Sequence, residues 1–476
     1  LLIDAENAFN KLNREAALKN IKQICPSLHQ FLNNSYRKPA KLFMANGSHI
    51  LSEEGVTQGD PAAMAKYALA SKPLIMKLKD IHPEVKQVWY ADDGTGAGKF
   101  DHLKVFWDSL CQYGPAYGYF PKATKSVLIV KDPTKVEKAK EVFAGANIEI
   151  TCEGQRHLGA VIGTPAYKDQ YVKQKVQKWV KDVEKLSTFA TDEPQLALAA
   201  YTKGVSSRWQ YLQRTVPNIA DYFRPLEYVL RHKLIPALVG REVSDTERRI
   251  FGLPYRFGGL AIRNPVLTAD EEYQASSSIT SELTRLIINQ IDDVQSVNEI
   301  AVRVAKENFR KSKEENLKKS FDNICKLLPE EQRRYLHSAT EKGASSWLAV
   351  LPLKSLGYSL NKREFQDAIR LRYGWHIPDM PSHCGCGKRN SVDHSLDCKL
   401  GGYVHLRHNN IRDAEARIMR EVAFDVKIEP ELSSVSKNVK LAPGSKTEDN
   451  ARSDVSARGI FSSHELTFFD VRISNP

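Results

Sequence analysis

The segments Leu1–Asp4 (LLID) and Val88–Gly94 (VWYADDG) each place acidic residues directly after a run of apolar ones. The apolar runs predict short core strands. Burying an unpaired carboxylate is costly, so acids that end core strands usually lie at a sheet edge and face a cation or a substrate. We therefore expect two neighbouring strands that bring Asp4 and Asp92 together.

Converging carboxylates of this kind suit a pair of divalent metal ions. In two-metal phosphoryl or nucleotidyl transfer, carboxylates hold ions about 4 Å apart that activate the attacking oxygen and stabilise the leaving one. The triplet Asp92-Asp93-Gly94 is also a common hairpin turn. Taken alone, it therefore leaves an ordinary turn as an equal alternative.

Three motifs occur in a fixed order, namely Asp4–Asn10 (DAENAFN), Glu54–Pro61 (EGVTQGDP) and Tyr90–Asp93 (YADD). In this order they resemble the palm of a reverse transcriptase of the non-LTR retrotransposon type. The resemblance implies that Asp4 and Asp92 bind two Mg²⁺ ions and that Asp93 accompanies them in the turn.

The same resemblance gives roles to three residues outside the acids. Phe9 corresponds to the steric gate, which excludes a ribose 2′-hydroxyl; without the motif it would be interpreted as a core aromatic. Gln58 and Gly59 correspond to the loop that contacts nucleotide and template, where glycine permits close backbone approach. An RNA-dependent RNA polymerase is a further interpretation, which Phe9 argues against because an RNA synthesiser needs a small gate residue.

The segment Gly118–Ser126 (GYFPKATKS) resembles the next family block, whose lysine neutralises or protonates the departing pyrophosphate. Lys125 matches that lysine, whereas Lys122 stands where the family usually has Asn. The assignment therefore stays open between the two lysines, with a solvated lysine as the alternative. His157–Gly163 (HLGAVIG) resembles the hairpin that grips the primer end, and its apolar content equally suits a buried strand.

A helical pattern follows this region. One apolar stripe has the spacing of a helix and is flanked by lysines on the other faces: Val172, Val176, Trp179, Val180 and Val183. By resemblance this is the thumb, whose lysines would track a duplex backbone without reading its sequence. Further along, the charged run Arg310–Glu315 is interpreted as a solvated helix face.

A compact cluster with the pattern C-x-C-x7-H-x3-C consists of Cys384, Cys386, His394 and Cys398. Four such ligands can close on one tetrahedral Zn²⁺, and a site filled by protein ligands is structural. The first spacing is tighter than C-x2-C, so a chance cluster of free thiols is the alternative. His383 is a possible substitute ligand, and such a knuckle could also touch nucleic acid.

The last segment resembles the PD-(D/E)xK nuclease core, with Asp454 followed by Asp470 and Arg472 on an apolar strand. In non-LTR elements of the restriction-like endonuclease group, a zinc knuckle, an Arg-His-Asn block (here Arg407–Asn409) and such a nuclease follow the polymerase. The resemblance implies that Asp454 and Asp470 bind Mg²⁺ and activate water against a DNA phosphodiester.

The nuclease motif departs from the family pattern at two positions. Arg472 replaces Lys, and since it stays charged it could only stabilise the transition state. Ser453 stands where Pro is expected. The alternative is that Asp454 and Asp470 are solvated acids, and His408 suits a structural hydrogen bond as well as catalysis.

Composition agrees with a nucleic-acid partner. The 476 residues carry 69 Lys and Arg against 57 Asp and Glu, a formal charge of +12. This surplus favours a polyanionic partner. Seven cysteines form no disulfide framework and suit a reducing compartment. No apolar run approaches the length of a membrane-spanning helix, so we expect no membrane partner.

The sequence thus predicts an α+β multidomain protein. Its expected parts are a palm with an antiparallel sheet and helices (1–165), a helical thumb (166–265), a helical connector (266–377), a zinc knuckle (378–402) and an α/β restriction-like endonuclease (403–476). The expected function is RNA-directed DNA synthesis with DNA nicking, that is, target-primed reverse transcription in the nucleus. The implied partners are element RNA, target DNA and deoxynucleoside triphosphates.

The alternative function is a catalytically dead, nucleic-acid-binding remnant of such an element. The chain opens on Leu1, inside an expected strand, and the family's fingers normally precede that strand. We therefore expect a fragment of a longer polypeptide, one that does not polymerise on its own.

Overall fold

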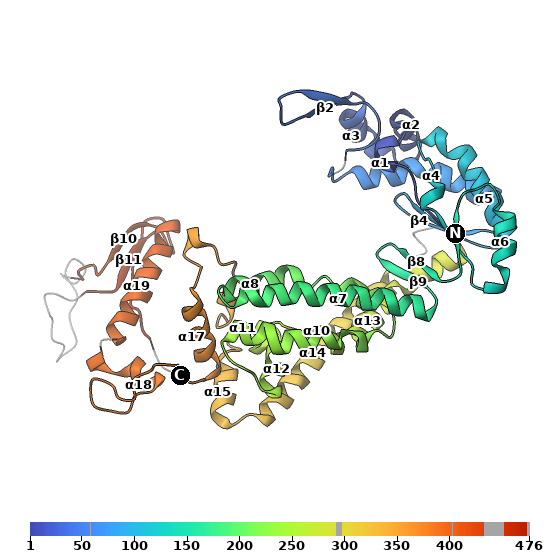
Figure 1. Cartoon of the computed structure of the whole chain (residues 1–476). Coiled ribbons are helices and arrows are strands. Elements are labelled where there is room, and N and C mark those ends of the chain that lie inside the picture. Colours follow the sequence, from blue (N-terminus) through green and yellow to red (C-terminus); the bar gives the residue numbers. More distant parts are fainter. Residues whose placement is uncertain (58, 292–297, 402, 433–451, 474–476) are drawn as a thin grey trace. The chain divides into compact units, whose positions relative to one another are not determined.

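The computed structural model describes residues 1–473 apart from 58, 292–297, 402 and 433–451. The chain divides into two compact units, Leu1–Ile369 and Arg370–Pro476 (Figure 1). Helices predominate and several small sheets accompany them, which confirms the expected mixture of α and β structure. The assignments to palm, thumb, connector and nuclease stay predictions.

The first unit begins with a five-stranded sheet in the order β4-β5-β1-β6-β7. β1 lies between β5 and β6 and is antiparallel to both, and only β6 and β7 are parallel. The strands are β1 (Leu2–Ile3), β4 (Lys86–Tyr90), β5 (Asp93–Ala97), β6 (Val127–Ile129) and β7 (Glu149–Thr151).

Six helices pack with this sheet around one apolar core, which includes Ile3, Tyr67, Leu78, Phe106 and Leu128. The helices are α1 (Ala8–Lys11), α2 (Arg14–Ile24), α3 (Pro26–Tyr36), α4 (Ala63–Ile81), α5 (Phe100–Tyr113) and α6 (Val136–Val142). Two hairpins complete the region: β2 (Ala40–Phe43) with β3 (His49–Ser52), and β8 (Gly154–His157) with β9 (Ala160–Gly163).

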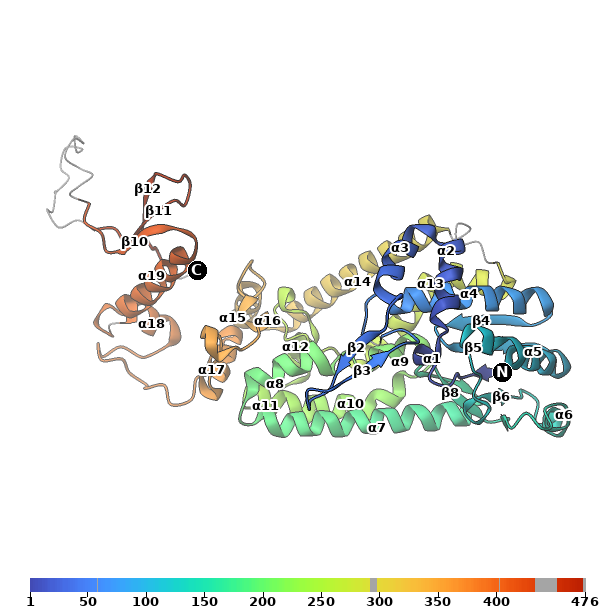
Figure 2. The ribbon, with the colours of Figure 1, turned by 90° about the horizontal axis from the view of Figure 1, so that it is seen from above.

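A helical bundle fills the rest of the first unit, with α7 (Pro165–Ala190) and α14 (Glu299–Leu327) as its long members (Figure 2). Thr164 caps α7 by accepting a hydrogen bond from the Tyr167 amide. The predicted apolar stripe of α7 is buried at four of its five positions, while Val180 is half-buried. Trp179 stacks on Phe223, with 6.2 Å between the ring centroids.

The other helices of the bundle are short, apart from α13. They are α8 (Pro194–Ala200), α9 (Gln210–Thr215), α10 (Arg224–Val229), α11 (Ile235–Val239), α12 (Asp245–Gly252), α13 (Pro265–Asn289), α15 (Glu330–Ser338) and α16 (Ser346–Ala349). The boundary between the two units, after Ile369, falls within α17 (Lys362–Tyr373). Among the described residues, no helix combines the length and the apolar character needed to cross a membrane.

The second unit holds a three-stranded antiparallel sheet in the order β10-β11-β12. Its small core consists of Ala416, Met419, Val455 and Ala457. The elements are α18 (Val392–Asp397), α19 (Tyr403–Val422), β10 (Phe424–Ile428), β11 (Val455–Arg458) and β12 (Leu466–Phe469).

Candidate functional sites

The first candidate site forms where β1 ends and β5 begins. Ile3 pairs with Gly94 in the antiparallel register, so the next position outward sets Asp4 beside Asp93. Asp92 lies in the tight turn between β4 and β5, whose flanking residues Tyr90 and Asp93 are paired. The structure therefore brings the three acids to one edge of the sheet, and each is half-buried.

Burial and neighbouring negative charge raise the pKa values of Asp92 and Asp93. Burial raises the pKa of Asp92 above its usual range, and the negative charge of Asp4 raises it further. Burial likewise raises the pKa of Asp93, and Asp92 and Asp4 add to the rise. Mutual repulsion of this kind is relieved by a bound cation. The oxygen donors present therefore fit a hard divalent ion such as Mg²⁺.

The two candidate lysines have different partners. The Lys125 Nζ lies 3.7 Å from the Asp4 Oδ1, whereas the Lys122 Nζ lies 3.5 Å from the Glu6 Oε2. Glu6 also accepts a hydrogen bond from Lys11 at 3.0 Å. Of the two, Lys125 is thus the lysine beside the acidic cluster.

The block around Lys125 is hydrogen-bonded to the acidic strand ends. The Lys122 amide donates to the Asp4 carbonyl at 2.8 Å, and the Asp4 amide donates to the Ser126 hydroxyl at 3.2 Å. The Tyr119 hydroxyl donates to the Asp92 carbonyl at 2.8 Å. Segments more than a hundred residues apart in sequence are therefore held together at the acidic cluster.

Phe9 packs on a tyrosine whose titration is influenced by this cluster. Its ring stacks on the ring of Tyr67, with 4.8 Å between the centroids and 20° between the planes. Burial raises the pKa of Tyr67, and the charge of Asp92 raises it further, which places the phenol near that carboxylate. Phe9 is half-buried and packs against the core, so part of its surface stays accessible.

Gly59 lies beside Gln58, which falls outside the described residues. The backbone of Gly59 has φ +91°, and the position of an added Cβ would meet no atom within 4 Å. A glycine is favoured there by backbone conformation, and the space beside it is open.

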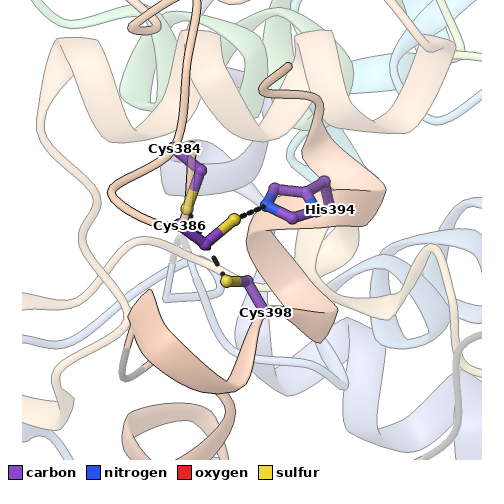
Figure 3. A group of neighbouring side chains, drawn as sticks. All are labelled: Cys384, Cys386, His394 and Cys398. Atoms are coloured by element: carbon purple, nitrogen blue, oxygen red, sulfur yellow. Dashed lines mark hydrogen bonds between the residues drawn. The ribbon is translucent and has the colours of Figure 1, made fainter. Parts of the chain in front are cut away.

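The second candidate site is the Cys/His cluster, whose four side chains face one another (Figure 3). Their ligand atoms lie within 4.8 Å of one another. The Cys384 and Cys398 sulfurs are 3.6 Å apart, and the Cys386 sulfur is 3.2 Å from the His394 Nε2. A tetrahedral Zn²⁺ with Zn–S bonds of about 2.3 Å separates two sulfurs by about 3.8 Å. The donor set therefore fits zinc.

Local structure explains this convergence. Cys384 and Cys386 lie on a tight turn, in which the Cys384 amide donates to the Lys388 carbonyl at 2.9 Å. His394 lies on α18, Cys398 directly follows the end of that helix one turn further on, and the Ser391 hydroxyl caps its start. His383 is not part of the cluster, and its Nδ1 lies 3.1 Å from the Ser382 hydroxyl.

The third candidate site lies in the sheet of the second unit. Val455 pairs with Phe469 in the antiparallel register, so the next position sets Asp454 opposite Asp470. The Asp454 carboxylate accepts a hydrogen bond from the Val471 amide at 2.6 Å and lies 3.3 Å from the His408 Nε2.

Arg472 contacts the second acid of this pair. Its Nε lies 2.9 Å from the Asp470 Oδ2, and this hydrogen bond holds the pKa of Asp470 below its usual range. Among the residues that the sequence singled out, the structure therefore places two acids, one arginine and His408 at a single sheet end.

Comparison with known proteins indicates the origin of the sequence. No protein-family model matches the sequence. Over 459 residues the chain is 21% identical to the retrotransposable element SLACS 132 kDa protein of Trypanosoma brucei gambiense.

The chain is related to a retrotransposon protein. The alignment covers 92% of this chain and 34% of the relative, so the chain spans about a third of that protein's length. This similarity supports the expected retrotransposon-related origin, and the non-LTR type of element stays a prediction. The restriction-like endonuclease group stays a prediction.

Sequence reasoning missed the residues that hold the loop before Gly59. Arg14 is buried, and its guanidinium donates to the carbonyls of Ser52 and Glu54, both at 2.9 Å. Lys66 is fully buried within α4, and its Nζ lies 3.5 Å from the centre of the Tyr36 ring. In the sequence, the feature that could have revealed Lys66 was a lysine placed among apolar residues.

Proposed function

We propose that this retrotransposon-derived chain carries the acidic centre of an RNA-directed DNA polymerase. The observation that supports this most is the strand register that joins Asp4 and Asp93 next to Asp92. Acids gathered on adjacent antiparallel strands, with the pKa values of Asp92 and Asp93 raised, suit the binding of divalent ions that take part in nucleotidyl transfer.

Asp4 and Asp92 would hold two Mg²⁺ ions, which when bound supply activation of the attacking 3′-hydroxyl and stabilisation of the leaving pyrophosphate. Lys125, beside Asp4, would neutralise or protonate the departing group. Phe9 would exclude ribonucleotides, and Gln58 and Gly59 would contact nucleotide and template.

A second activity is proposed for the other unit. Asp454 and Asp470 would bind Mg²⁺ and cleave a DNA phosphodiester, with Arg472 stabilising the negative charge of the transition state. Cys384, Cys386, His394 and Cys398 would hold a structural Zn²⁺. Together the two activities would nick target DNA and extend its 3′-hydroxyl on element RNA in the nucleus.

Primer extension tests the polymerase proposal. The assay uses the longest protein that includes this chain and that its element encodes. It is supplied with an RNA template, a DNA primer, deoxynucleotides and Mg²⁺. We expect Asp92→Asn to reduce extension by about 100-fold or more, the scale of losing one transition-state contact. Asp108→Asn removes an exposed acid that pairs with Lys104, and this control should keep full activity. Undiminished extension by Asp92→Asn would refute the proposal.

The catalytically dead remnant is the second candidate function. Lys122 pairs with Glu6 where the family usually has Asn, and Arg472 replaces the nuclease lysine. This candidate predicts RNA binding that weakens steeply with salt, together with no Mg²⁺-dependent synthesis or nicking by the longest protein.

A further inference from the structure

A large basic cleft lies within the first unit, between α12, α13, α14 and the segment 253–264. Its volume is about 1440 Å³, which exceeds the about 300–1,000 Å³ of pockets for small molecules. Nine of its lining residues are Lys or Arg and three are Glu, a formal surplus of six positive charges. These dimensions and charges suit a polyanion larger than a nucleotide.

One face of α14 supplies much of this charge. Residues of this face line the cleft and follow one another at intervals of three and four: Arg303, Lys306, Arg310, Lys313 and Leu317. Like charges at such intervals destabilise a helix by about 0.2–0.5 kcal/mol per pair. A bound polyanion would relieve this repulsion.

Some of the cleft's cations already have partners inside the protein. Lys313 and Arg263 lie 3.8 Å and 3.1 Å from the Glu272 carboxylate, which is 1% exposed and also accepts from Arg214 at 3.0 Å. Lys311 pairs with Glu307 at 3.0 Å. The buried ion cluster around Glu272 ties α14 to α13 and α9, so it fixes one wall of the cleft.

Four other cations of the cleft differ from these. Arg249, Arg303, Lys306 and Arg310 are exposed, and no carboxylate of the residues that the structure describes pairs with them. Three of the four follow one another on α14, and the fourth comes from α12. They are therefore available to an external ligand.

The rest of the lining indicates how that ligand is held. Among the described residues, none that line the cleft is aromatic, whereas proteins that hold single strands stack bases on aromatic rings. Guanidinium and ammonium groups without stacking partners favour contact with phosphates. We propose that this cleft binds the phosphate backbone of a nucleic-acid duplex through Arg249, Arg303, Lys306 and Arg310.

This site is separate from the acidic cluster, and its occupation requires no polymerase chemistry. The test uses the full chain with three substitutions, Arg303→Gln, Lys306→Gln and Arg310→Gln. A matched control removes the same charge from exposed positions of α14 outside the cleft, with Lys318→Gln, Lys319→Gln and Lys326→Gln. Circular dichroism checks that both variants keep their helices.

Binding of a fluorescent RNA duplex is measured by anisotropy across a range of KCl concentrations. Each neutralised phosphate contributes about 0.7–0.9 to the slope of log affinity against log salt, so the cleft variant should lose roughly 2–3 from that slope. Its affinity at low salt should fall at least tenfold, while the control binds as the unsubstituted chain does.

Two results would overturn this proposal. Equal losses in both triple variants would mean that only overall charge matters. A single strand that binds as tightly as the duplex, and loses as much in the cleft variant, would exclude a duplex-specific site. Selective loss of duplex binding in the cleft variant, together with no synthesis in the primer-extension assay, would support the cleft and refute the polymerase.

Discussion

Both units bring two acids together at the end of an antiparallel strand pair, but the apolar cores behind these pairs differ. In the first, Asp4 follows and Asp93 precedes the last pair of β1 with β5, Ile3 with Gly94, inside a five-stranded sheet. In the second, Asp454 and Asp470 precede and follow the pair of β11 with β12, in a sheet of three strands. One register step beyond an antiparallel pair is enough to align two carboxylates.

The support behind each pair is unequal. The first sheet packs on a core that includes large side chains such as Phe106, Trp107 and Leu110, whereas the second packs on four small or medium residues. Buried apolar area is the main source of stability. The comparison teaches that the second unit needs another stabilising element, for which the Cys/His cluster is the candidate.

The largest expected effect comes from removing that element. Structural zinc contributes about 10–16 kcal/mol of apparent binding free energy to small domains. We expect Cys384→Ser with Cys398→Ser to abolish hydrogen-exchange protection in α18, α19 and the strands β10, β11 and β12 of the second unit, with the helices and strands of the first unit unaffected. Mass spectrometry of the full chain measures both units at once.

The matched control is Cys25→Ser with Cys111→Ser, two free thiols of the first unit. It should change neither unit's protection. Two results together would contradict a stabilising role for the cluster. They are unchanged hydrogen-exchange protection in the doubly substituted chain and no zinc in elemental analysis of the unsubstituted chain.

The next effect concerns the tightly packed first unit. A Cβ at Gly118 would lie 2.2 Å from the Asn13 nitrogen and the Lys11 oxygen, and its φ is +78°. Overpacking and the left-handed backbone together should make Gly118→Ala destabilising by about 3 kcal/mol or more. Urea unfolding followed by tryptophan fluorescence measures the change.

Gly47→Ala is the control for backbone strain alone. Gly47 has φ +81° and no atom within 4 Å of an added Cβ. This variant should lose only about 1 kcal/mol. Equal losses in the two variants would show that the close approach at Gly118 does not matter.

A buried charge in the first unit gives a smaller effect of opposite sign. Burial lowers the pKa of Lys66 from 10.5 to about 7. Between these values the unfolded chain binds more protons than the folded one, so stability rises with pH. Lys66→Met should therefore stabilise the chain at pH 7 by about 1–3 kcal/mol, since an apolar residue replaces a buried amine that makes no hydrogen bond.

The same linkage predicts the pH profile. The advantage of Lys66→Met over the unsubstituted chain should shrink as the pH rises from 7 towards 10. Over this range the folded chain has released the Lys66 proton while the unfolded chain still holds it, so each rise in pH stabilises the unsubstituted chain. Thermal unfolding across this range measures it. An advantage that grows with pH would contradict the assignment of the burial penalty to Lys66.

The smallest effect concerns Asp470, an exposed acid of the second unit. Arg472→Gln removes the hydrogen bond that lowers the pKa of Asp470, so that pKa should rise towards its ordinary value. A lowered carboxyl pKa stabilises the fold above the unfolded pKa, and this contribution disappears as pH falls through the folded pKa. Carboxyl carbon chemical shifts followed by NMR would detect the change. A constant Asp470 pKa would show that the contact is not formed.

The sequence allowed some of these features to be predicted because their causes are local. The Cys/His cluster follows from a spacing of a few residues and one turn of helix, and the stripe of α7 follows from helical periodicity. The acids at strand ends could be proposed because apolar runs stop at them, although their pairing with metals stays a prediction.

Other features depend on long-range contacts that no local pattern shows. The Arg14 guanidinium donates hydrogen bonds to carbonyls about forty residues later in the chain. The Glu272 carboxylate forms ion pairs with cations from three separate segments. The charged run Arg310–Glu315 was interpreted as a solvated face, yet Arg310 and Lys313 line the basic cleft. Charge alone does not tell which neighbour a side chain will meet.

The compactness of the Cys/His cluster has a consequence for the order of folding. Its donors fall within a turn and the helix that follows it, so little chain entropy opposes their closure. The strands β11 and β12 come later in the chain. On the ribosome, this part of the second unit could therefore assemble while the residues of its central strand are still untranslated.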